Sequence, residues 1–250
     1  MRTAFLLAAM GAALALSGCG DKGANGGAGN SATPSGSPVA AVAAPAGTSW
    51  SETIAASPEG GFVMGNPNAK LKLIEYASYT CPHCKEFAEH ADEPLRKYVD
   101  TGKVSYEFRN FVRDPLDITA ALIARCGGKD PFFPLSHQVF GNQDAMFQKI
   151  QSVGDKGYQD AMKLPPQQRF ARLAELAGLI DFAKTRGIPE AQARTCLANF
   201  KEAETLAAGN DAGVKKYGIE GTPTLILNEK KLENANTWPL LETALKAAGA

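Results

Sequence analysis

The sequence contains few of the residues that metal and cofactor sites need. It has only 3 histidines in 250 residues, and its cysteines include a single closely spaced pair, Cys81 and Cys84. A structural zinc site needs four ligands, and no second closely spaced Cys/His pair supplies the other two. The formal net charge is zero, which indicates neither a nucleic-acid partner nor a strongly charged one. We therefore expect no metal and no cofactor, with a Cys-x-x-Cys metal-binding module as an alternative.

Long apolar runs are missing except at the N-terminus, and nothing further along approaches the length of a membrane span. The N-terminus has one early charge, Arg2, then an apolar stretch from Ala4 to Leu16, and small residues before Cys19. This pattern predicts a signal peptide over residues 1–18. Its ending resembles a bacterial lipobox, in which Cys19 would be lipidated and become the first residue of the mature protein. An ordinary signal peptide with an incidental cysteine is the alternative.

Large apolar residues are also scarce between the signal peptide and the rest of the chain. Residues 20–57 are mainly Gly, Ala, Ser, Asn and Pro, and such a composition buries too little surface to offset the entropy of ordering it. We expect residues 19–57 to form a lipidated, disordered tether, with folded structure beginning near Gly60. The protein would then be periplasmic and held to a bacterial membrane through the lipid on Cys19.

The chain does have a strand that is followed at once by two cysteines and a helix. Leu71 to Ala77 is rich in strand formers, Cys81-Pro82-His83-Cys84 follows, and apolar residues then recur at helical spacing. With Cys81 at the first turn, its sulfur faces backbone N–H groups without helical partners and the positive end of the helix dipole. Pro82 suits the first helical position, where its missing N–H has no partner to lose.

This arrangement predicts different roles for the two cysteines. The helix terminus and a protonated His83 should lower the pKa of Cys81. Cys84, one turn further in, should be more shielded. We therefore expect Cys81 to exchange disulfides with a partner and Cys84 to resolve the mixed disulfide. Because a stabilised thiolate stabilises the reduced form, the disulfide form should be a strong oxidant.

The remaining pattern predicts an α/β fold interrupted by helices. A second strand over residues 103–112 would complete a right-handed parallel βαβ unit. We expect a first half over residues 58–114, an all-helical insertion over 115–205 and a second half over 206–250. Helices are expected over 115–126, 131–147, 165–182, 189–200, 201–217 and 237–248, with strands over 222–227 and 230–232. Aromatic residues in the second of these helices, Phe132, Phe133, Phe140 and Phe147, are at a spacing typical of core packing.

The order of these motifs resembles the DsbA family of thioredoxin-fold thiol:disulfide oxidoreductases. The likeness covers about residues 61–248, and it is carried by Glu75, the CPHC motif, the helical insertion and Gly221-Thr222-Pro223-Thr224. It implies a thioredoxin fold with a large all-helical insertion between its two halves. It also implies that Pro223 is a cis-proline beside the disulfide and that Thr222 offers backbone hydrogen bonds to an extended substrate. A proline at the first residue of a strand is the alternative.

Three more residues have predicted roles. A carboxyl at Glu75, on a core strand, is costly unless it is paired or protonated. In the family an acidic residue here is implicated in proton transfer with the buried cysteine, and a strand-end glutamate that reaches solvent is the alternative. Cys126 and Cys196 lie in expected helices of the insertion. In an oxidising compartment we expect a structural disulfide between them, which would stabilise the fold by roughly 4 kcal/mol. Two unpaired buried thiols are the alternative.

The predicted function is that of an exported disulfide oxidase. Its Cys81–Cys84 disulfide would pass to reduced or unfolded secreted proteins, and the resemblance implies reoxidation by a membrane quinone-linked partner of the DsbB type. A disulfide reductase or isomerase is the nearest alternative. Isomerases of this class usually dimerise through a separate N-terminal domain, which residues 20–57 are too simple in composition to supply. A metal-binding module and a holdase are more distant alternatives.

Overall fold

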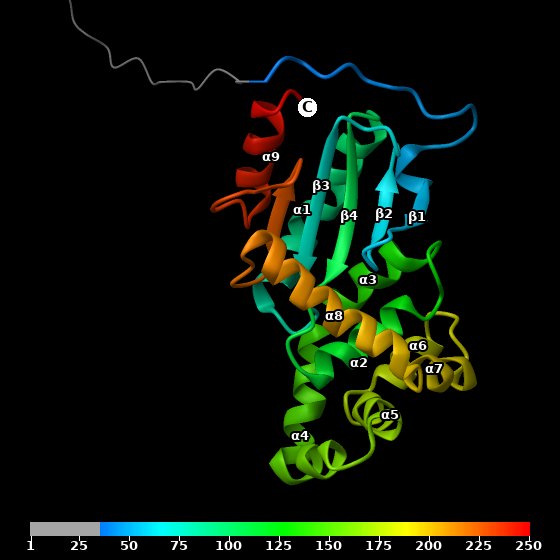
Figure 1. Cartoon of the computed structure of the whole chain (residues 1–250). Helices are drawn as coiled ribbons and strands as arrows, with labels where there is room; N and C mark the ends of the chain where they lie inside the picture. Colours follow the sequence, from blue (N-terminus) through cyan, green and yellow to red (C-terminus); the bar gives the residue numbers. More distant parts are fainter. Residues whose placement is uncertain (1–35) are drawn as a thin grey trace, which may run out of the picture. The chain divides into compact units, whose positions relative to one another are not determined.

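The computed structural model describes residues 36–250, so the predicted signal peptide and Cys19 lie outside the described residues. The described residues form a six-stranded mixed sheet with helices on both faces and a helical insertion at one end (Figure 1). The strands are β1 (Ile54–Ala56), β2 (Phe62–Gly65), β3 (Leu71–Ala77), β4 (Val104–Asn110), β5 (Thr224–Leu227) and β6 (Lys230–Lys231). The helices are the 3₁₀ helix η1 (Trp50–Glu52), α1 (Pro82–Asp100), α2 (Pro115–Arg125), α3 (Phe132–Gly141), α4 (Gln143–Met162), α5 (Pro166–Leu176), α6 (Leu179–Lys184), α7 (Glu190–Leu197), α8 (Phe200–Tyr217) and α9 (Trp238–Ala247).

The centre of the sheet is the predicted βαβ unit. The strand order is β1-β2-β4-β3-β5-β6, and β3 and β4 are parallel and connected by α1. These two strands are buried over almost their whole length because helices cover both faces of the sheet. Since β3 and β4 run in the same direction, the loop with the two cysteines and the start of the insertion leave the same end of the sheet. The predicted thioredoxin fold with a helical insertion is confirmed.

Helices cover the two faces of the sheet with different patterns. The buried residues of α1 recur every three or four positions, and they are Cys84, Phe87, Ala91, Leu95 and Val99. This spacing gives α1 one apolar face, which packs with α9 on one side of the sheet. Helix α8 crosses the opposite side (Figure 1), where Gly213 allows the ring of Tyr76 to approach the helix backbone. The active-site helix is therefore fixed along its whole length by core contacts.

The helical insertion is more divided than predicted. The single helices expected over 131–147 and 165–182 are each two helices, and the second break falls at Gly178 with φ 71°. Helix α4 also changes direction at Gly154, where φ 72° and ψ 169° are not helical. L side chains rarely adopt such positive φ values, so glycine is favoured at both breaks. No helix within residues 36–250 has the length and apolar character that crossing a membrane requires.

The tether expected over residues 19–57 is wrong in its last part, because residues 36–57 pack against the folded domain. The backbone N–H of Val42 donates to the end of α1 (2.9 Å), and other N–H groups of the segment donate to the end of α9. The indole N–H of Trp50 donates to the carbonyl of Val42 (2.7 Å). Low complexity suggested disorder, but the few apolar side chains of the tract, including Trp50 and Ile54, pack against the main core.

Gly102, just after α1, makes room for this segment. Its φ is +70°, and a Cβ there would clash with the carbonyl of Val42 and lie 2.8 Å from the indole nitrogen of Trp50. We expect Gly102→Val to lower the free energy of unfolding by about 1–3 kcal/mol, because backbone strain and steric conflict both contribute. Urea denaturation measures the loss. Gly187→Val is the matched control, since Gly187 has φ +81° and open space around it. Equal losses in the two variants would show that the clash contributes nothing.

Candidate functional site

Cys81 is the N-cap residue of α1. Its backbone is extended, Pro82 occupies the first helical position, and its carbonyl accepts hydrogen bonds from the backbone N–H groups of Cys84 and Lys85 (3.2 Å each). Both cysteines are free thiols. Cys81 is 5% exposed and Cys84 is fully buried, so the predicted order of accessibility is confirmed. The N-cap position results from the proline, which can begin the helix but cannot continue the strand's hydrogen bonding.

The two thiols have opposite pKa shifts. The pKa of Cys81 falls to about 5, mainly because the Cys84 thiol donates a hydrogen bond to it; burial opposes this, and the side chain of Thr222 and the backbone N–H groups of Cys84 and His83 assist it. The pKa of Cys84 is raised, first by burial and then by the same hydrogen bond to Cys81. At neutral pH the outer sulfur is therefore the anion and the inner one keeps its proton.

Thr222, which precedes Pro223, lies against the outer cysteine although it is 141 positions away in the sequence. The Thr222–Pro223 peptide bond is cis, as the resemblance implied. The Sγ of Cys81 lies 3.2 Å from the carbonyl oxygen of Thr222, which accepts a hydrogen bond from the thiol form. An open pocket of about 400 Å³ borders Thr222 and the β5–β6 hairpin. Polypeptide backbone in this pocket would lie against Thr222, the residue whose carbonyl contacts the Cys81 sulfur.

A second open pocket lies between α1 and the start of α9. It has a volume of about 490 Å³ and is lined by Phe87 and His90 of α1 together with Trp238 and Pro239. Apolar walls with a few polar groups suit the side chains of a bound polypeptide. The two pockets thus offer surfaces for an extended chain at Thr222 and along the second turn of α1.

His83 lies on the outer side of the first turn of α1. Its side chain is 77% exposed, and its Nδ1 lies 3.8 Å from Glu86 Oε2. The backbone N–H of His83 is among the groups that favour the Cys81 thiolate. The predicted effect of a protonated His83 side chain, a lower pKa of Cys81, stays a prediction.

Glu75 is buried in β3, with 2% of its surface exposed. The hydroxyl of Tyr106 donates a hydrogen bond to its carboxyl group. Burial raises the pKa of Glu75 to about 7; the Tyr106 hydrogen bond opposes the rise and the charge of Asp92 adds to it. The charge of Glu75 in turn contributes to the raised pKa of Cys84. The alternative of a strand-end glutamate that reaches solvent is therefore wrong, while proton transfer stays a prediction.

Glu75→Gln is expected to stabilise the protein by about 3 kcal/mol at pH 8. The folded protein keeps the Glu75 proton up to about pH 7, whereas the unfolded chain releases it near 4.5. Wild-type stability therefore falls as the pH rises between these values, and the variant lacks this fall. Urea unfolding at several pH values measures the difference, which should vanish below about pH 4.5. The exposed Glu204→Gln is the control, and a Glu75→Gln effect that is constant with pH would contradict the assignment.

Two residues that were not predicted from the sequence hold the loop before Cys81. The fully buried Asp117 of α2 accepts hydrogen bonds from the Ser78 hydroxyl (2.5 Å) and the Tyr79 backbone N–H (2.8 Å). Gln143, at the start of α4, donates to the carbonyls of Tyr79 (2.8 Å) and Cys81 (3.0 Å). The insertion therefore fixes this loop from two helices. An acidic residue in the first turn of α2 is visible in the sequence, but its partners in the loop are not.

The second cysteine pair is joined. Cys126, at the end of α2, and Cys196, in α7, form a disulfide across a sequence separation of 70 residues. The predicted structural disulfide is confirmed, and it links two helices of the insertion. Among residues 36–250 there is no cluster of three or more His, Cys, Asp and Glu side chains that would hold a metal ion.

Fold and site together define a class: thioredoxin-fold proteins with a Cys-x-x-Cys pair at a helix N-terminus, a neighbouring cis-proline and a helical insertion. The chain belongs to the thioredoxin family, because the family model described as Thioredoxin matches residues 57–247. The family resemblance predicted from the order of the motifs is confirmed.

Relatives and solved structures agree with this assignment. A Rickettsia bellii protein, whose name places it provisionally among the protein-disulfide oxidoreductases, is 30% identical over 177 residues, which cover 70% of this chain and 60% of that protein. The chain thus spans less than two thirds of the length of the curated relatives it matches. A protein-disulfide isomerase from Novosphingobium aromaticivorans has a TM-score of 0.71 and 33% identity, covering 74% of this chain and 95% of its own. The alpha-DsbA1 of Wolbachia pipientis, with a TM-score of 0.61 and 22% identity over 77% of this chain and 92% of its own, shares the fold.

Proposed function

We propose that the protein is an exported thiol:disulfide oxidoreductase that donates its Cys81–Cys84 disulfide to reduced secreted proteins. The observation that carries this proposal is the position of Cys81 at the N-cap of α1, with a pKa of about 5. A thiolate that is stabilised in the reduced protein favours reduction of the Cys81–Cys84 pair and oxidation of the substrate.

The reaction transfers two electrons from the substrate to the protein. A substrate thiolate attacks the Sγ of Cys81, the Cys81–Cys84 bond breaks, and Cys84 leaves and takes up a proton. A second substrate thiolate then attacks the substrate sulfur of the mixed disulfide, and Cys81 leaves as a thiolate. The low pKa of Cys81 makes it a good leaving group in this step. Glu75, buried nearby and charged above about pH 7, is the group proposed to exchange the proton with Cys84.

Substrate binding is proposed to use the two pockets beside Cys81. The backbone at Thr222 can pair with an extended polypeptide, and the pocket beside Trp238 can receive its apolar side chains. Together they favour an unfolded or reduced protein segment over a small thiol. The same surfaces would bind the partner that reoxidises the protein.

We further propose that the protein is periplasmic, anchored by a lipid on Cys19, and reoxidised by a membrane quinone-linked partner of the DsbB type. The signal-peptide pattern and the lipobox-like ending before Cys19 support this. Incorporation of a labelled fatty acid into the wild type but not into Cys19→Ser tests the anchor. Reoxidation of the reduced protein by quinone-containing membranes, and its loss when quinone is removed, tests the partner.

Isomerisation or reduction is the alternative direction, and the name of the Novosphingobium neighbour favours isomerisation. One experiment separates the two. The oxidised protein is mixed with a reduced test protein, and the reduced protein with the same test protein carrying scrambled disulfides. An oxidase forms disulfides rapidly and stoichiometrically in the first mixture. Faster recovery of activity in the second mixture, or a Cys81–Cys84 equilibrium with glutathione that strongly favours the disulfide, would contradict the proposed direction.

A further inference from the structure

We infer that a groove on the helical insertion, separate from the pocket beside Trp238, binds a second segment of the substrate polypeptide. The groove selects segments in which an apolar residue is followed by Lys or Arg. This inference rests on the proposed function, because the occupant is the chain whose cysteine reacts with Cys81. It adds a preference for substrate sequence that the redox centre alone does not supply.

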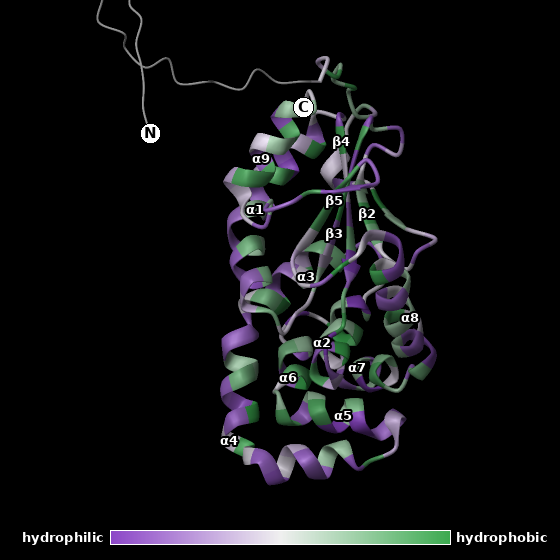
Figure 2. Ribbon diagram, turned by 60° about the vertical axis from the view of Figure 1, so that its left-hand side comes forward, coloured by the Kyte–Doolittle hydropathy of each residue, from purple (hydrophilic) through white to green (hydrophobic). Residues whose placement is uncertain are grey.

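The groove is built by the change of direction in α4. It is an open pocket of about 530 Å³ between the two segments of this helix and the start of α2. Figure 2 shows α4 turning partway along its length, and the turn is at Gly154, where the backbone has a φ of 72°. The turn brings Tyr158, on the second segment, into the lining together with Phe147 and Ile150 on the first. An unbroken helix would point away from this surface and leave no groove.

The groove begins close to the reactive cysteine. Asp114, in its lining, accepts a hydrogen bond from the hydroxyl of Thr80 (3.0 Å), the residue before Cys81. Gln143, where α4 begins, donates to the carbonyl of Cys81. Ile150 is two turns further along the helix, a rise of about 10 Å. An extended polypeptide advances about 3.3 Å per residue, so residues three to five positions from the reacting cysteine reach the groove.

The floor of the groove is apolar. Leu116 is buried beneath it, and Phe147 and Ile150 are half-buried side chains that pack on the core and keep part of their surface in the groove. Tyr158 forms a further wall, and burial together with the charge of Asp114 raises the pKa of its hydroxyl. Such a surface suits an aliphatic or aromatic side chain of a bound polypeptide.

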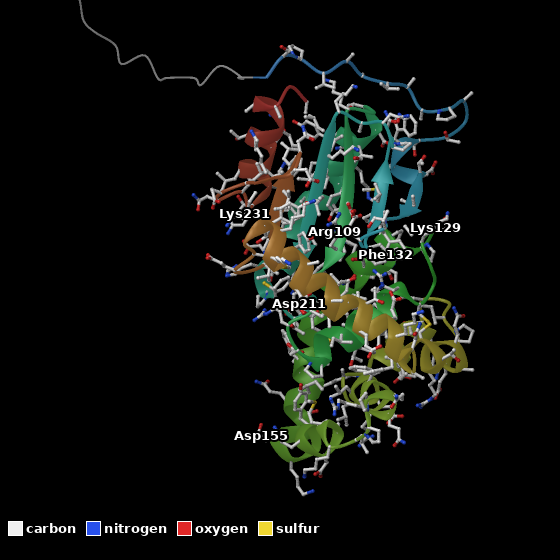
Figure 3. The ribbon with its side chains drawn as sticks, in the orientation of Figure 1. Arg109, Lys129, Phe132, Asp155, Asp211 and Lys231 are labelled. Carbon is white, nitrogen blue, oxygen red and sulfur yellow. A yellow bond between two sulfur atoms is a disulfide. The ribbon has the colours of Figure 1, made fainter. Side chains whose placement is uncertain are left out.

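The rim of the groove is acidic. Asp114 and Asp155 line it, and neither forms a salt bridge with another residue of the described part of the chain. By contrast, Asp144 and Asp160 on the same helix are each paired with lysines. The exposed Arg113 points its guanidinium at the carbonyl of Thr80 (3.4 Å). Figure 3 shows Asp155 at the outer end of the insertion, away from the sheet. Two carboxylates without a salt bridge, beside an apolar floor, complement a cationic residue next to an apolar one.

Two reduced peptides, each with two cysteines, test the inference. One peptide carries Leu-Lys four residues from the cysteine pair, and the other carries Ser-Glu at the same place. Each is made in two versions, with the dipeptide before or after the cysteines. Their oxidation by the full-length disulfide form is followed in acid-quenched single-turnover reactions at low salt. We expect the Leu-Lys peptide to be oxidised about tenfold faster at limiting concentration, since burying one anchor residue and pairing one charge are worth about this factor.

Variants of the groove locate the preference. Ile150→Asn and Asp155→Asn should each reduce the tenfold preference to about twofold or less. Neither should change the rate at which dithiothreitol reduces the Cys81–Cys84 disulfide. Val153→Asn and Asp160→Asn are matched controls on α4, because neither residue lines the groove, and they should keep the full preference. Circular dichroism and the unchanged dithiothreitol rate confirm that the variants are folded.

Different failures have different meanings. If both peptides are oxidised quickly with no preference, or if the groove variants keep it, the groove is not a substrate site although the proposed function stands. If neither peptide is oxidised by the wild type, the proposed function fails and this inference fails with it. If Ile150→Asn converts a dimer to a monomer in solution, a second copy of the chain occupies the groove and the inference is also overturned.

Discussion

Replacing Cys81 by serine is expected to abolish disulfide transfer, with a loss of at least about a thousandfold in the rate at which a reduced test protein is oxidised. A serine hydroxyl cannot form the disulfide that the reaction consumes, and Cys84 is fully buried and therefore cannot replace it. The raised pKa of Cys84 also keeps it protonated at neutral pH. Oxidation of the test protein, followed by trapping of its remaining thiols, measures the loss.

Cys84→Ser is the matched variant with a different expected result. Its serine hydroxyl can still donate a hydrogen bond to Cys81, the largest cause of the lowered Cys81 pKa, so Cys81 should remain reactive. When the reduced variant meets a protein that carries a disulfide, Cys81 attacks one of its sulfurs and the other leaves as a thiolate; without the resolving thiol, this mixed disulfide should accumulate and be visible by non-reducing electrophoresis. Identical behaviour of the two variants would show that the cysteines do not have the separate roles assigned to them.

The second large effect is a pH-dependent stabilisation of the reduced protein. The pKa of Cys81 is about 5 in the fold against an ordinary thiol value of 9, so between these values the unfolded chain binds the proton and the folded protein does not. Stability of the reduced form therefore rises with pH across this window and is lost as the pH falls through 5. From pH 5 to pH 8 the difference in unfolding free energy between reduced and oxidised protein should increase by about 4 kcal/mol.

This difference isolates the contribution of Cys81. Glu75 and other titrating groups are present in both redox forms, so most of their contribution cancels, and the raised pKa of Cys84 keeps it out of the window. Urea unfolding of both forms between pH 4 and pH 9 measures the difference, and the ultraviolet absorbance of the thiolate gives the Cys81 pKa directly. A thiolate that titrates near 9, or a difference that is constant with pH, would remove the basis of the proposed oxidase activity.

The helical insertion contributes to the site in two ways. Asp117 and Gln143 hold the loop before Cys81 in place, and the same α4 that carries Gln143 forms one side of the proposed substrate groove. A segment bound in this groove would therefore contact the helix that also fixes the carbonyl of Cys81. This places substrate selection and the geometry of the redox centre on one element.

Much of the centre could be predicted because it depends on near neighbours in the chain. Cys81 becomes an N-cap because Pro82 can only begin the helix, and Cys84 is buried because it shares the apolar face of α1 with Phe87. Glu75 could be placed in a core strand from the alternation around it, and its raised pKa follows from burial. The proximity of Thr222 to Cys81 was predicted only through the family resemblance, since nothing in the spacing of the two residues requires it.

The predictions that failed concern segments whose structure depends on distant partners. Composition suggested that residues 36–57 would be disordered, yet Trp50 finds an acceptor and an apolar surface on the folded domain. No helix was predicted over residues 148–162, which form the rest of α4, and the direction change at Gly154 was therefore not predicted either. Capping, burial and helix polarity act over a few residues, so the sequence alone determined a polarised cysteine pair at the start of a helix. Only the tertiary structure decided which distant side chains contact that pair and which groove lies beside it. Contacts at long range depend on how all the elements pack together.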